Sequence, residues 1–123
     1  MTRLVVLLLL AAVPAAAQRG GCGFGLGLDA LRGADQPLRA GADAGSLLAG
    51  REAAAAAADR LAAAAASLDG CGCSQAARHV RDAAGLAEEA RGAASLERIR
   101  HGLDRARFST RLARERMDRQ GCS

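Results

Sequence analysis

Two cysteines separated by a single residue are the most reactive feature of the sequence. In the stretch "LDGCGCS", residues 68–74, Cys71 and Cys73 lie on either side of Gly72. A Cys-x-Cys dithiol can exchange disulfides, and a helix N-terminus beside it favours the thiolate. Together with His79, these cysteines would offer two sulfurs and an imidazole to copper or zinc. One hypothesis is therefore a periplasmic thiol-redox or copper/zinc-binding protein that uses the Cys71-Gly72-Cys73 motif.

The other two cysteines favour a structural role for all four. Cys22 lies 49 positions before Cys71, and Cys122 lies 49 positions after Cys73. Four cysteines in a small exported domain usually form two disulfides, and closing loops of this size stabilises a fold by about 4 kcal/mol each. We predict the pairs Cys22–Cys71 and Cys73–Cys122. The crossed arrangement is the alternative, because Cys71 and Cys73 are so close together.

The first residues have the pattern of a secretory signal peptide. In "MTRLVVLLLLAAVPAAAQ", Arg3 precedes an apolar run over residues 4–13, and small residues follow at 15–17. At about 1.5 Å per residue, this run is too short to cross a hydrocarbon core of roughly 30 Å. We therefore expect residues 1–17 to be cleaved, no integral membrane span afterwards, and a periplasmic or secreted protein.

The segment that follows is rich in glycine. Over residues 18–34, glycines alternate with Cys22, Phe24, Leu26 and Leu28, which is a period of two. Glycine at every second position disfavours a helix, so we predict an N-terminal arm that is extended, or at most a short helix, pinned by Cys22. Pro37 has the position of a first helical residue, which places the start of a bundle domain, residues 35–123, near Asp35.

Three amphipathic helices are predicted beyond this segment, over residues 46–69, 74–92 and 95–119. Ser46, Ser74 and Ser95 each stand where a helix N-cap is needed. The last range carries an unbroken coiled-coil pattern of steps of three and four residues, at Leu96, Ile99, Leu103, Ala106, Thr110, Ala113 and Met117. The alternative is one long helix over 74–119. The expected fold is an all-α, disulfide-stapled, up-down bundle of three main helices.

Positive charge gathers in the C-terminal half. The net charge is +4, and residues 78–119 hold eleven Arg against seven acidic residues. Arg100, Arg107 and Arg114 are seven apart and form a line that could contact an anionic polymer or an acidic membrane surface. Acidic neighbours at 97, 104 and 118 would compensate much of this line. Nucleic acid is disfavoured by export and by the scarcity of aromatic side chains, since the chain has two Phe and no Tyr or Trp.

Two apolar side chains do not fit the coiled-coil pattern. Phe108 and Leu112 are four residues apart and point away from Leu103 and Ala106, so they need a second partner. Either the N-terminal segment covers them, or they form a contact for another protein. An exposed Phe108 would favour the second interpretation.

Candidate catalytic residues do not cluster in the sequence, and the carboxylates are scattered among arginines. We therefore expect an exported, non-catalytic helical binding or structural module of the bacterial cell envelope, without a cofactor. Its expected partner is an envelope protein or an anionic envelope polymer.

Overall fold

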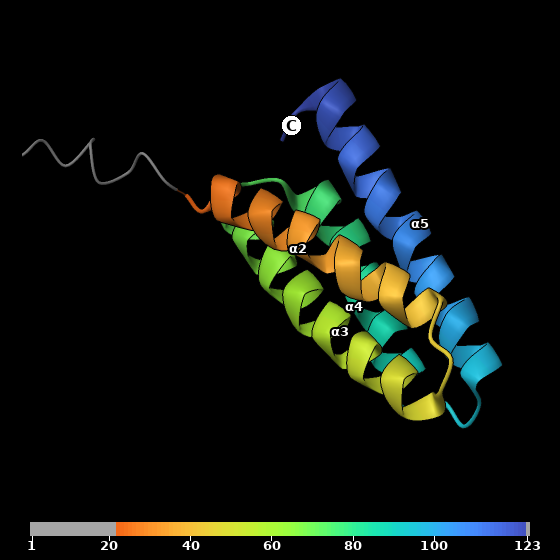
Figure 1. Ribbon diagram of the computed structural model, residues 1–123. Helices are drawn as coiled ribbons and strands as arrows, with labels where there is room; N and C mark the ends of the chain where they lie inside the picture. Colours follow the sequence, from red (N-terminus) through yellow and green to blue (C-terminus); the bar gives the residue numbers. More distant parts are fainter. Residues whose placement is uncertain (1–21, 123) are drawn as a thin grey trace, which may run out of the picture.

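A computed structural model describes residues 22–122, and these residues form an up-down bundle of four helices (Figure 1). The helices are α2 (Phe24–Ala42), α3 (Leu47–Gly70), α4 (Ser74–Arg91) and α5 (Leu96–Gln120). The all-α, disulfide-stapled bundle is confirmed, with four helices instead of three main ones. In the part described, no helix is long and apolar enough to cross a membrane. The expected signal peptide, 1–17, lies outside the described residues.

Helix α2 corrects the prediction of an extended arm. It begins at Phe24 and crosses the expected boundary between arm and bundle, so Pro37 lies inside a helix and not at its start. One stripe of α2 is buried at steps of four and three residues: Gly27, Leu31, Ala34, Leu38 and Gly41. Two of these positions are glycines because neighbouring helices come very close there.

The closest approach in the bundle is at Gly41. A Cβ atom on this residue would overlap Cδ1 of Leu103 on α5 and lie 3.2 Å from Cβ of Ala53 on α3. Leu103 is fully buried, so a shift of its side chain would displace other residues of the close-packed core. The glycine therefore lets the C-terminal end of α2 pack directly against both neighbours.

The boundaries of the other helices follow from local signals. The Ser46 hydroxyl accepts a hydrogen bond from the Ala49 amide at 3.1 Å, and the Ser95 hydroxyl accepts one from the Arg98 amide at 3.3 Å. Both predicted N-caps are confirmed. Ser74 is instead the first residue of α4, and the N-cap is Cys73, which makes no side-chain cap. Because the chain leaves the helix between Arg91 and Leu96, the single long helix is excluded.

Leucine and alanine form the core, as the lack of large aromatic residues requires. The predicted pattern of α5 faces this core: Ile99, Leu103, Ala106 and Ala113 are fully buried. Thr110 is the one polar side chain buried among the described residues, and its hydroxyl donates to the Ala106 carbonyl at 2.9 Å. The buried face therefore follows the periodicity that the sequence shows.

Candidate functional site

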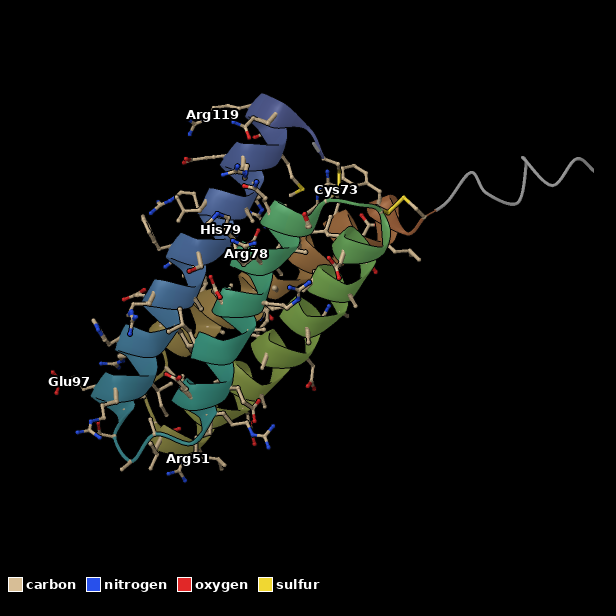
Figure 2. All side chains as sticks on the ribbon, turned by 180° about the vertical axis from the view of Figure 1, so that it is seen from behind. Arg51, Cys73, Arg78, His79, Glu97 and Arg119 are labelled. Atoms are coloured by element: carbon tan, nitrogen blue, oxygen red, sulfur yellow. A yellow bond between two sulfur atoms is a disulfide. The ribbon has the colours of Figure 1, made fainter. Side chains whose placement is uncertain are left out.

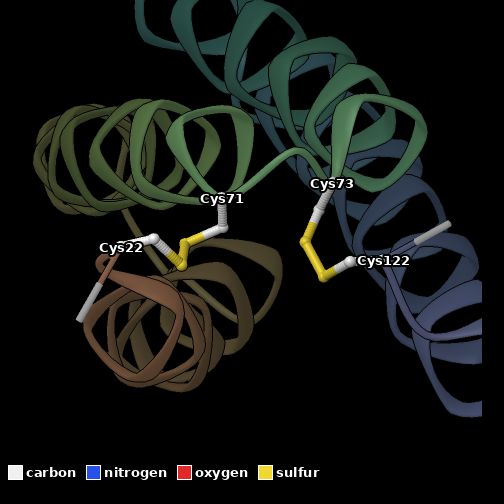
Figure 3. The surroundings of a disulfide bond; sticks show 4 residues. All are labelled: Cys22, Cys71, Cys73 and Cys122. Atoms are coloured by element: carbon white, nitrogen blue, oxygen red, sulfur yellow. A yellow bond between two sulfur atoms is a disulfide. The ribbon is translucent and has the colours of Figure 1, made fainter. Parts of the chain in front are cut away.

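The four cysteines form two disulfides, Cys22–Cys71 and Cys73–Cys122, with Cα atoms 5.0 Å and 4.3 Å apart (Figure 3). The predicted pairing is confirmed and the crossed pairing is excluded. Both bridges start from the turn between α3 and α4, where Gly72 has a positive φ of 79°. One bridge holds the start of α2 against α3, and the other holds the end of α5 near α4.

The structure does not assemble the alternative metal site. The sulfur atoms of Cys71 and Cys73 are both in disulfides. His79 points from α4 toward α5, where it lies near Leu112 and Glu115 (Figure 2). Within residues 22–122, no group of three or more His, Cys, Asp or Glu side chains could hold a metal ion.

A polar groove lies between α2 and α5, the first and last helices of the bundle. It holds a cavity of about 420 Å³. Four arginines and two aspartates line it, together with an aromatic ring and a hydroxyl: Asp35, Arg39, Asp104, Arg107, Phe108, Thr110, Arg111 and Arg114. The excess of guanidinium groups makes this groove a candidate site for an anion.

The three arginines of the predicted line lie in different environments. Arg114 donates to Asp35 at 2.8 Å and to the Leu31 carbonyl at 3.1 Å, so it pairs across the groove and not with its helical neighbour. Arg107 lies 3.6 Å from Asp104, as the sequence predicts. Arg100 donates to the Ala44 carbonyl, which fastens α5 to the turn after α2. The line is thus not a continuous free surface, and Arg100 does not line the groove.

Two guanidinium groups of the groove remain available for a ligand. Within the described residues, no carboxylate pairs with Arg39 or Arg111. The Arg111 guanidinium lies 5.5 Å from the centre of the Phe108 ring, a cation–π arrangement. These two groups account for the positive character of the groove, because Asp35 and Asp104 already have arginine partners.

Phe108 is exposed, although the sequence leaves open whether the N-terminal segment covers it. Its exposed fraction is 52%, which favours the interpretation as a contact residue. Leu112 is half-buried and lines a different hollow, beside His79 and between α4 and α5. The structure therefore separates the two apolar residues and places only Phe108 in the groove.

A second cavity continues the groove toward the disulfides. It measures about 340 Å³ and is largely apolar. Its lining comes from the N-terminal half of α2 and the C-terminal half of α5: Phe24, Leu28, Leu31, Arg32, Arg114, Met117 and Asp118. Arg114 lines both cavities, so the two lie end to end. Sequence reasoning missed the α2 residues of this site because it predicted residues 18–34 as an arm or a short helix, and not as part of one long helix that begins at Phe24.

A hollow larger than either cavity of the groove lies between α4 and α5, with a volume of about 520 Å³. In its lining, Glu89 and Glu97 balance Arg98 and Arg105. This hollow therefore has no excess charge that would select a ligand.

Comparison with protein families, with curated proteins and with solved structures finds no match for this chain. A proposal for its function must therefore start from the geometry and chemistry of the groove between α2 and α5.

Proposed function

We propose that the chain is an exported, non-catalytic helical module of the bacterial cell envelope that binds an acidic ligand in the groove between α2 and α5. The observation that carries this proposal is the pair of unpaired guanidinium groups, Arg39 and Arg111, beside the exposed ring of Phe108. Export is supported by the signal-like N-terminus and by the two disulfides, which persist in oxidising compartments.

The chemistry of arginine defines the ligand class. A guanidinium group is planar, stays charged at any physiological pH, and can donate two parallel hydrogen bonds to a carboxylate or a phosphate. Both expected partner classes, an envelope protein and an anionic envelope polymer, carry acidic groups of this kind.

The proposal can be tested with two double variants of equal charge. Arg39→Gln with Arg111→Gln removes the free guanidinium groups of the groove, whereas Arg78→Gln with Arg98→Gln removes two exposed arginines outside it. Binding is measured by titration calorimetry at low salt, with polyglutamate and polyuronate as the acidic probes. We expect the groove variant to lose about tenfold in affinity and the control to change less than twofold. Equal losses in both variants, or no loss in either, would refute the proposal.

A further inference from the structure

The groove changes its character along its length. At one end, Arg39 and Arg111 face a polar cavity. At the other end, Leu28 and Met117 are half-buried walls over the fully buried Leu31. At a rise of about 1.5 Å per residue, Arg39 and Phe24 lie about 22 Å apart along α2. The groove is thus long, charged at one end and apolar at the other.

The fold keeps the apolar end open. At the far end of the bundle, the contact between Gly41 and Leu103 and the hydrogen bond from Arg100 to Ala44 hold α2 against α5. At the disulfide end, one bridge ties the start of α2 to the start of the α3–α4 turn and the other ties the end of α5 to the end of that turn, so no disulfide joins α2 to α5 (Figure 3). The two helices diverge toward this end (Figure 1).

Between the two cavities stands the ion pair of Arg114 and Asp35. The pair neutralises both charges, and Arg114 lines both cavities, so a ligand that spans them lies over a neutral ion pair. At the apolar end, Arg32 is engaged by Asp29 at 3.5 Å, and the remaining charge is the carboxylate of Asp118. An acidic group is therefore favoured only at the end with Arg39 and Arg111.

This distribution of charge distinguishes between ligands. An acidic polymer carries charges along its whole length and would place some of them over Leu28 and Met117, beside the carboxylate of Asp118. A ligand with one acidic head and an alkyl chain matches both ends at once. Resting on the proposed function, we infer that the acidic ligand is a straight-chain fatty acid, with its carboxylate at Arg39 and Arg111 and its chain along the half-buried Leu28 and Met117.

A series of straight-chain acids tests this inference on the intact, oxidised protein. Octanoate, decanoate and dodecanoate are titrated below their micelle concentrations, with acetate as the bare anion and dodecan-1-ol as the uncharged chain. We expect the dissociation constant to fall about fourfold for every two methylene groups, the value for an open groove that covers half of each group. Acetate and the alcohol should bind at least tenfold more weakly than dodecanoate.

Variants separate the two ends of the groove. Arg39→Gln with Arg111→Gln should weaken every acid by a similar factor and leave the dependence on chain length unchanged. Met117→Gln should flatten that dependence, whereas Leu48→Gln, an exposed apolar residue outside the groove, should change nothing. The inference fails, and the proposed function stands, if polyglutamate binds but longer acids gain nothing over acetate. Both fail if no acidic probe binds, or if the alcohol binds as tightly as the acid.

Discussion

Exchanging Gly41 for alanine tests whether α2 depends on a glycine for its contact with α5. An alanine in a helix is favoured over glycine by about 1 kcal/mol. At this site, however, the new methyl group would overlap Leu103, which is fully buried, and crowd Ala53. Overpacking of this kind costs typically about 1–3 kcal/mol, and the upper part of that range applies where the neighbour cannot move. We therefore expect a net loss of about 2 kcal/mol in the free energy of unfolding.

Gly85 provides the matched control, because it lies inside α4 and a Cβ atom there would meet nothing within 4 Å. Gly85→Ala should stabilise the protein by about 1 kcal/mol through helix propensity alone. The same substitution thus has opposite effects at the two sites. In a domain of this size, each kcal/mol shifts the midpoint of thermal unfolding by about 4–8 °C, so the two variants should melt more than about 10 °C apart.

The assay is unfolding followed by far-UV circular dichroism, in heat and in urea, with the disulfides intact. A second substitution, Leu103→Ala, leaves a cavity next to Gly41 and should cost about 2–5 kcal/mol by itself. The double variant should lose less than the sum of the two single losses, because the methyl group of the new alanine then has room. If Gly41→Ala is as stable as Gly85→Ala, the reasoning about close packing is wrong.

Other substitutions test local features of the fold. Replacing Cys73 and Cys122 by serine should cost about 4 kcal/mol in urea unfolding, and intact mass of the parent protein before and after reduction should show four oxidised cysteines. A loss below 1 kcal/mol, or free thiols in the exported protein, would contradict the pairing. Ser46→Ala should cost about 1 kcal/mol by removing an N-cap, whereas Ser74→Ala should change stability by less than half of that, because Ser74 is the first residue of α4 and not its N-cap. Thr110→Val keeps the shape of the buried side chain, and its free energy of unfolding should stay within about 1 kcal/mol of the parent value. The substitution removes the hydroxyl together with its hydrogen bond to Ala106, so no unpaired donor is left buried.

The three C-terminal helices could be predicted because their signals are local. Periodic apolar positions such as Ile99 and Leu103, and caps such as Ser46, depend only on residues within one helix. Helix α2 could not be predicted in the same way, since its glycines disfavour a helix in isolation. The helix forms nevertheless, because Gly27 and Gly41 let α2 pack closely on its neighbours. This packing stabilises α2 only when the whole bundle is assembled.

The candidate site was accessible from the sequence in part. Phe108, Arg107 and Arg114 were predicted as contact residues, and all three line the groove. The partner wall was missed together with α2, although Asp35 decides the role of Arg114. The role of Arg100 could not be predicted, because its acceptor is a backbone carbonyl 56 residues away in the chain.

The position of Gly72 between the two bridges has a topological consequence. The bridges do not interlock: one closes residues 22–71 and the other closes residues 73–122. A protease cut in either of the two distal turns would leave the fragments covalently joined, because each turn lies inside a closed loop. A cut at Gly72 would instead divide the oxidised protein into two separate helical hairpins. This exposed residue is therefore the one place where breaking a single peptide bond leaves only noncovalent packing between the halves of the described chain.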